Sequence, residues 1–434
     1  MEKSKKSTKF YIALVIFSLV GQVAWVVENM YLNVFIYKMF HATAADISLM
    51  VAASALAATV TTLLIGALSD KIGKRKLFIC GGYILWGISI LGFAVIRMDV
   101  INALFPAAVS AASIGVSLVI ILDCLMTFFG SSANDAAFNA WLTDSTDETN
   151  RGKAEGINAM MPLVAILVVF GSFMSFNQDH PETWTIIFSI IGGAVLLLGI
   201  AGFFLIEDTG VKVEENSHYF QNIFYDFRPS VVKKNVRLYM TLLVLALFNI
   251  SIQIFMPYLI LYYTESLGLS NYVLIFAPAI IVSAVFTALY GRVYDNHGFQ
   301  KAIIPTLVLL MVGYVLLYLV RNTALVFIAS LIMMCGYIGT GAVIGALIRD
   351  CTPANKAGMF QGLRIVGQVL IPGIIGPAIG AWVLQNADTV TNSDGTVSFI
   401  PNENIFLAAL IAILAAWIAI IPLFKLLKGA RHAH

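Results

Sequence analysis

The stretch GALSDKIGKRK, from Gly66 to Lys76, returns later in the chain as GRVYDNHGFQK, from Gly291 to Lys301. The two stretches align without a gap, 225 positions apart, and share Gly66/Gly291, Asp70/Asp295, Gly73/Gly298 and Lys76/Lys301. Each forms a polar turn between two apolar segments. The repeat indicates a duplicated chain whose two halves share one fold.

The composition places the chain in a membrane. Of its 434 residues, 59% are apolar and 12% are charged, whereas soluble domains carry about 25% charged residues. About 20 apolar residues are needed to cross the hydrocarbon core as a helix, and helices satisfy their backbone hydrogen bonds without water. We therefore predict an all-α membrane protein with twelve transmembrane helices in two six-helix bundles. The approximate spans are 10–37, 46–68, 77–97, 115–142, 154–176, 185–206, 236–263, 272–290, 302–320, 324–348, 358–384 and 404–424.

Positive charge is distributed unevenly between the two ends of these spans. Of the 26 Lys and Arg residues, 22 fall on the side that holds the N-terminus. Lys38, Arg97 and Arg321 fall on the other side, and Arg364 lies inside an apolar segment. Because cytoplasmic segments carry the excess of Lys and Arg, we expect both termini in the cytoplasm. The expected location is a plasma membrane or a bacterial inner membrane.

The spans divide the chain into two bundles joined by a polar linker. We place an N-terminal six-helix bundle in residues 1–206, a cytoplasmic linker in 207–235, and a C-terminal bundle with a short cytoplasmic tail in 236–434. A second pair of similar stretches, NRGKAEG from Asn150 and NKAGMFQG from Asn355, lies about 205 positions apart. The first half is therefore longer, and we assign its surplus to 98–115, as an outer loop or a short interfacial helix.

The repeated stretch resembles the signature loop of the major facilitator superfamily, because it falls between the second and third of twelve spans and again between the eighth and ninth. The resemblance covers the whole chain and implies a transporter that works by alternating access. It also implies that these loops latch the two halves on the cytoplasmic side. Glycine permits the tight turn, and an aspartate favours a helix N-terminus; a solvated basic turn is the alternative. The gate residues would be Gly66, Asp70, Gly73, Arg75, Asp295 and Gly298.

A narrower resemblance is to the glycoside-pentoside-hexuronide:cation symporters, the family of the melibiose permease. NDAAFNAWLTDSTDETNRGK, from Asn134 to Lys153, is similar to the family's fourth helix and following loop, and ENMYLNVFIY is similar to its first helix. This resemblance implies that Asp135 serves the sugar and the coupling ion, that Gln22 lies near the family's sugar-binding Asp, and that Arg364 lies near the Lys of the family's eleventh helix. The second span has no acidic residue, unlike the sodium-coupled members, so we expect a proton rather than sodium.

Four ionisable residues lie within the spans: Glu28, Asp123, Asp135 and Arg364. Charged groups in a bilayer are costly and mark pathways or relays. With three acids against one Arg, at least one carboxyl group has no cation, and desolvation favours its protonated form. Glu28 is the leading proton carrier because its repeat partner, Gln253, does not titrate; a carboxyl group hydrogen-bonded for packing is the alternative. Arg364 would pair with Asp135 or bind the solute directly.

Further polar and aromatic residues in the spans are candidates for binding the solute. Those on the fourth span recur at helical spacing, which indicates a stripe facing water or protein. The aromatic residues could stack on sugar faces or simply pack between helices. The candidate solute-binding residues are Gln22, Trp25, Glu28, Asn134, Asp135, Phe138, Asn249, Gln253, Tyr337, Arg364 and Gln368.

These observations predict a secondary transporter that moves a polar organic solute, a sugar or glycoside, by proton-coupled symport. The alternative is a proton-coupled exporter of lipophilic compounds. The sequence shows no phosphate loop or nucleophile constellation, and its four cysteines stand without metal or redox spacing. We expect no enzymatic activity, no cofactor, no metal and no nucleic-acid partner, and a monomer in the lipid bilayer.

Overall fold

The computed structural model describes residues 7–106, 110–147, 150–208, 228–352, 362–392 and 395–431, without the side chains of Ala67, Asp70 and residues 429–431. Within these ranges, twelve helices are long and apolar enough to cross a membrane. The predicted all-helical architecture and its twelve spans are therefore confirmed. The chain forms two compact units, Met1–Ala42 with Leu56–Gln221 and Thr43–Ala55 with Asn222–His434.

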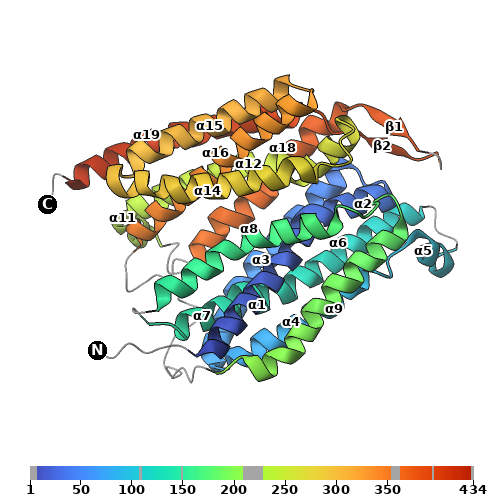
Figure 1. Cartoon of the computed structure of the whole chain (residues 1–434), viewed down its shortest axis with the longest axis horizontal. Coiled ribbons are helices and arrows are strands. Elements are labelled where there is room, and N and C mark those ends of the chain that lie inside the picture. The colour runs from blue at the N-terminus through green and yellow to red at the C-terminus, as the bar shows by residue number, and fades with distance from the viewer. Residues whose placement is uncertain are drawn as a thin grey trace. The chain divides into compact units, whose positions relative to one another are not determined.

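The first unit contains the first six spans except the start of α3, which belongs to the second. Their elements are α1 (Thr8–Val26), η1 (Val27–Tyr31), α2 (Leu32–Phe40), α3 (Ala44–Ile72), α4 (Arg75–Phe93), α5 (Met98–Leu104), α6 (Ala111–Gly130), η2 (Ser131–Phe138), α7 (Asn139–Asp144), α8 (Arg151–Phe173) and α9 (Pro181–Leu205). Helix α4 packs along α9, and α1 packs against α8 and α9 (Figure 1). The first span is a continuous run of α1, η1 and α2, and the fourth is a continuous run of α6, η2 and α7.

Glycine allows the close packing of α4 on α9. A Cβ atom on Gly87 would lie 2.5 Å from the backbone nitrogen of Leu196, and one on Gly199 would lie 2.7 Å from that of Ile84. Small residues at helix contacts are the main means by which membrane helices approach each other closely. These glycines therefore allow α9 to pack closely on α4, the helix against which α6 and η2 pack.

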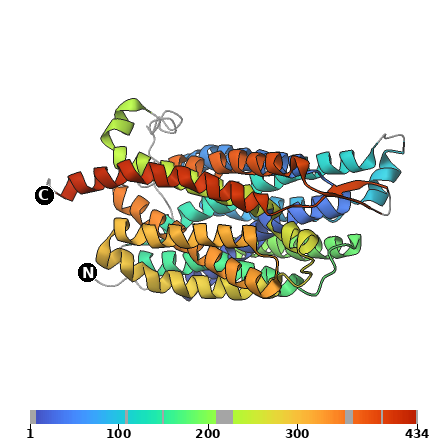
Figure 2. The same ribbon diagram turned by 90° about the horizontal axis from the view of Figure 1, so that it is seen from above.

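The second unit contains the last six spans together with Thr43–Ala55. Its elements are α11 (Pro229–Lys234), α12 (Val236–Phe255), η4 (Met256–Tyr258), α13 (Leu259–Leu261), η5 (Tyr262–Ser266), α14 (Val273–His297), α15 (Phe299–Leu319), α16 (Thr323–Cys351), η7 (Val366–Leu370), α18 (Ile371–Val383), η8 (Leu384–Asn386), β1 (Thr389–Thr391), β2 (Val397–Phe399) and α19 (Asn404–Arg431). Helix α15 packs along α16, and α12 packs against α18 and α19 (Figure 2).

Three local features refine the sequence predictions. The segment 98–115 contains the short helix α5, as one of the two alternatives for that segment predicted. The third span ends at Phe93 rather than near residue 97. The small antiparallel hairpin of β1 and β2, paired from Thr389 with Phe399, was not predicted. The domain boundaries stay a prediction, and most of the predicted linker lies outside the described residues.

Candidate functional site

Three of the candidate polar residues of the first and fourth spans lie where the α-helix widens into π-helical turns. Glu28 lies in η1, and Asn134 and Asp135 lie in η2. A π-helical turn inserts an extra residue into the helix and occurs frequently at functional sites. The sequence gives no sign of these turns, because hydrophobic periodicity does not distinguish one widened turn from an α-helix.

Glu28 is buried, with 7% of its surface exposed. Its Oε1 atom accepts a hydrogen bond from the Thr127 hydroxyl group at 2.8 Å. Its Oε2 atom is buried and has no hydrogen-bond partner among the described residues. Apolar side chains, including Ala24, Val27 and Met126, surround the carboxyl group. No Lys or Arg in the described part of the chain forms an ion pair with Glu28.

The other two predicted coupling residues lie in the same unit. Asp123 is buried on α6, one turn before Thr127. Asp135 accepts a hydrogen bond from the Ser131 hydroxyl group at 3.0 Å. Both aspartates lie close enough to Glu28 to act on it electrostatically. Glu28 is therefore the carboxyl group on which both aspartates act, Asp123 from α6 and Asp135 from η2.

Asn134 belongs to a buried hydrogen-bond chain that links three helical elements. Its side-chain amide donates to the Tyr83 hydroxyl group at 2.7 Å, and that hydroxyl group donates to the backbone carbonyl of Phe17 at 2.8 Å. A side chain at Gly21 would overlap both Asn134 and Tyr83. Sequence reasoning missed Tyr83, because a single Tyr in an apolar span gives no signal.

The aromatic candidates of the first unit differ in their surroundings. Trp25 is half-buried and packs against Trp86, with 5.0 Å between ring centroids. Gln22 is also half-buried, one turn earlier on α1. Phe138 is only 1% exposed and stacks with Phe17 and Trp141. Phe138 is therefore packed within the first unit, and its contact with a solute stays a prediction.

The remaining candidates lie in the second unit. Asn249 and Gln253 lie one turn apart on α12, and the amide nitrogen of Asn249 is buried without a partner among the described residues. Tyr337, on α16, stacks with Phe248. The Arg364 guanidinium group donates to the side-chain oxygen of Gln368, in η7, at 3.1 Å. The pairing of Arg364 with Asp135 stays a prediction, since these residues belong to different units.

The first copy of the repeated stretch forms an ion pair within the first unit. Gly73 has a φ of 69°, in the left-handed region that favours glycine. Two residues later, the buried Arg75 donates from Nε to Asp144 at 3.0 Å and from its Nη1 to Ser69 at 2.6 Å. Asp144 ends α7, so this contact joins the turn before α4 to the end of the fourth span. The Asp70 side chain lies outside the described residues.

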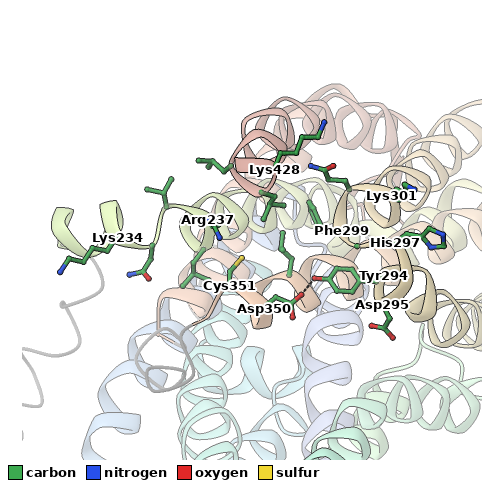
Figure 3. Close-up of a pocket in the computed structure, with 18 of the residues that line it drawn as sticks. Lys234, Arg237, Tyr294, Asp295, His297, Phe299, Lys301, Asp350, Cys351 and Lys428 are labelled. Atoms are coloured by element: carbon green, nitrogen blue, oxygen red, sulfur yellow. Dashed lines mark hydrogen bonds between the residues drawn. The ribbon is translucent and has the colours of Figure 1, made fainter. Parts of the chain in front are cut away.

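The second copy forms the corresponding contact without a cation. Gly298 has a φ of 75°, and the Tyr294 hydroxyl group donates to the carboxylate of Asp350 near the end of α16 (Figure 3). In the repeat register, Tyr294 replaces Ser69 and Gln300 replaces Arg75. The predicted gate residue Asp295 is exposed. The sequence analysis did not identify Asp144 and Asp350 as partners of the two repeated stretches. The offset of 205 positions between Asn150 and Asn355 places Asp144 opposite position 349, next to Asp350.

The described residues contain no group of three or more His, Cys, Asp or Glu side chains that could hold a metal ion. The chemistry that the three carboxyl groups can perform is the binding and release of protons or other small cations.

Comparison with known proteins identifies the fold. The model of the Major Facilitator Superfamily matches residues 11–377. No curated protein sequence matches the chain. Among solved structures, a bacterial homologue of the human lysosomal transporter Spinster is 13% identical, with a TM-score of 0.70 over 98% of this chain and 99% of that one.

Two further structures show the same fold. The nucleoside transporter NupG is 13% identical, with a TM-score of 0.67 over 96% of this chain and 99% of that one. A D-xylose-proton symporter is 14% identical, with a TM-score of 0.72 over 94% and 97% of the two chains. Such identities establish the fold and not the solute. Because the family model covers most of its length, the chain belongs to the major facilitator superfamily of secondary transporters.

Proposed function

We propose that the chain is a symporter that moves a polar organic solute, a sugar or glycoside, together with protons, with Glu28 as the proton carrier. The observation that carries this proposal is the surroundings of Glu28: a buried carboxyl group with one neutral hydrogen-bond donor, one oxygen without a partner, and no cation among the described residues. Such a group can hold a proton in the apolar interior and release it when water enters.

Asp123 and Asp135 support this role because they lie near Glu28. Neighbouring carboxyl groups cannot all remain charged without a compensating cation, so protonation of one makes charge on another less costly. Proton movement among the three groups is then a local event within the first unit. Asp135, whose carboxylate is held by Ser131, is the second member of the proposed coupling set.

The solute class is supported by the types of side chain in the proposed solute-binding set. The proposed solute-binding residues of the first unit are Gln22, Trp25, Glu28, Asn134, Asp135 and Phe138, and those of the second are Asn249, Gln253, Tyr337, Arg364 and Gln368. Amide, carboxylate, guanidinium and aromatic groups are those that recognise hydroxyl-rich solutes. The resemblance of Asn134–Lys153 to the glycoside-pentoside-hexuronide:cation symporters favours the same class. A xylose-proton symporter among the solved structures of this fold agrees with it.

The test measures uptake in proteoliposomes that contain the full chain. An imposed inward proton gradient should drive accumulation of a labelled sugar from a panel of hexoses, pentoses and glycosides. Glu28→Gln should abolish this accumulation and leave solute exchange between the two sides intact, because the amide cannot carry the proton. Glu155→Gln, which removes an exposed carboxyl group from α8 of the same unit, is the matched control.

Three outcomes would contradict the proposal. If a sodium gradient drives accumulation of the sugar and a proton gradient does not, the coupling ion is not the proton. Normal accumulation by Glu28→Gln would remove Glu28 as the carrier. Proton-dependent export of lipophilic compounds without sugar uptake would favour the exporter instead.

A further inference from the structure

A cavity of about 1010 Å³ opens at one end of the second unit (Figure 3). It lies where α12 and α15 begin and where α14 and α16 end, with residues of α11 and α19 completing the wall. None of the residues proposed to carry the proton or bind the solute lines it. The cavity is therefore separate from the proposed proton and solute sites, and it borders the predicted gate residues Asp295 and Gly298.

The wall of the cavity has an excess of positive charge. Five Lys and Arg side chains line it, against the two aspartates Asp295 and Asp350: Lys233, Lys234, Arg237, Lys301 and Lys428. Asp350 already accepts a hydrogen bond from Tyr294. Within the described ranges, none of the five cations forms an ion pair. The five come from α11, α12, α15 and α19 and all are exposed at this end of the unit; Lys234, Arg237, Lys301 and Lys428 are labelled in Figure 3.

The backbone adds to this positive character. Helices α12 and α15 both begin at the cavity, at Val236 and Phe299, and neither has a side-chain cap. The first N–H groups of a helix have no partner within it and carry the positive end of the helix dipole. A phosphate group fits such a site because it accepts several hydrogen bonds and carries the opposite charge.

The cavity also has an apolar part at the depth of the membrane surface. Leu238, Leu347, Leu426 and Leu427 line it together with Phe299. The spans that contribute these residues end here, so the cavity lies at the level where lipid headgroups meet the protein. A ligand that matches both parts carries a phosphate group and an apolar tail.

We propose that this cavity binds the phosphate group of an anionic phospholipid from the leaflet on the side of the two termini. Basic pockets between membrane helices are suited to such headgroups. In this site Arg237 supplies the planar fork that matches a phosphate, and Lys301 and Lys428 supply point charges. Leu426 and Leu427, which are half-buried, contact the glycerol and the first carbons of the acyl chains. A soluble phosphate compound shares the headgroup chemistry and is distinguished by the test.

The test uses native mass spectrometry of the full chain in detergent, with cardiolipin, phosphatidylglycerol or phosphatidylcholine added. The anionic lipids should be retained about tenfold more than phosphatidylcholine. The double variant Arg237→Gln/Lys301→Gln should lose about fivefold of this retention. The matched control is Arg292→Gln/Lys425→Gln, which removes the same charge from exposed residues of α14 and α19 outside the cavity and should keep the retention.

Two additions keep the result interpretable. Arg237→Lys/Lys301→Arg keeps the charge and should restore retention, which separates loss of binding from loss of folding. Inorganic phosphate at millimolar concentration is added as a competitor. Displacement of lipid by phosphate supports a site selective for the phosphate group itself and open to soluble compounds, whereas resistance to phosphate supports the lipid as the ligand. Equal loss in the two double variants, or no loss in either, overturns the proposal.

Discussion

At the scale of single residues, the hydrogen bond from Thr127 to Glu28 is the contact most open to test. Among the described residues, Thr127 is the side chain that donates a hydrogen bond to the carrier carboxyl group, and it comes from the neighbouring fourth span. Thr127→Val keeps the shape and removes the donor, at a cost of about 1 kcal/mol for one buried hydrogen bond. We expect proton-driven solute uptake to fall about fivefold in proteoliposomes, with Thr127→Ser close to the parent. Loss in Thr127→Ser with full uptake in Thr127→Val would show that the methyl group, and not the hydroxyl group, matters.

Some residues of the site could be identified from the sequence and others could not. Glu28, Asp123 and Asp135 were identifiable because charge in an apolar span is costly, and all three lie in the first unit. The roles of Tyr83 and Phe138 were not identifiable from type alone. Tyr83 anchors the chain from Asn134 to Phe17, and Phe138 is enclosed by aromatic rings. Both depend on which helices pack together, and that information is not local.

At the scale of elements, the two copies of the repeated stretch differ in how much protein stability depends on their partner aspartate. We therefore compare an Asp→Asn substitution at Asp144 with one at Asp350. Asp144→Asn would leave the buried Arg75 guanidinium group without its counter-charge, a loss of about 3 kcal/mol. Asp350→Asn keeps an oxygen that can still accept from Tyr294. We expect the melting temperature in detergent to fall by about 5–10 °C for Asp144→Asn and by less than about 3 °C for Asp350→Asn.

The control for this comparison is the double variant Arg75→Gln/Asp144→Asn, which removes both charges. Its melting temperature should lie above that of Asp144→Asn, because no unpaired buried charge remains. Equal effects of Asp144→Asn and Asp350→Asn would show that the ion pair contributes no more than the neutral contact does.

The π-helical turns are the elements that the sequence did not predict. Length and hydropathy define the fourth span, but its widening at Ser131–Phe138 depends on packing. Gly130, just before the turn, lies where a Cβ atom would be 2.7 Å from the Trp86 ring and 3.0 Å from the Trp25 ring. The position of the turn is thus tied to tertiary contacts between α1, α4 and α6. A hydrophobic window along one span contains no such information.

These turns should open more readily than the α-helix before them. A π-helical turn has less regular hydrogen bonding than an α-helix. We expect amide hydrogen exchange, followed by mass spectrometry, to be faster in residues 131–138 than in 116–130, although most residues of 131–138 are buried. Uniform protection through both segments would show that the turn is as rigid as its flanks.

At the scale of the whole molecule, duplication and divergence were both readable from the sequence. The repeat at Gly66 and Gly291 predicted two related halves, and the twelve spans and the family match agree with it. The grouping of Thr43–Ala55 with the second unit was not predicted. Tyr258 accounts for part of it, because its hydroxyl group donates to the backbone carbonyl of Ala44. The carrier carboxyl group and the buried ion pair both lie in the first unit, and the repeat positions of Glu28 and Arg75 in the second unit, Gln253 and Gln300, are neutral.

The orientation of the molecule is a prediction of the whole charge distribution and can be tested directly. Because 22 of 26 Lys and Arg residues fall on one side, that side should face the cytoplasm. In a cysteine-free background, Ser270→Cys in the loop before α14 and Lys71→Cys near the end of α3 place exposed thiols at opposite ends of the spans. A membrane-impermeant maleimide added to intact cells should label Ser270→Cys and spare Lys71→Cys until the cells are permeabilised. The reverse pattern would invert the orientation and would move the proposed lipid cavity to the outer leaflet.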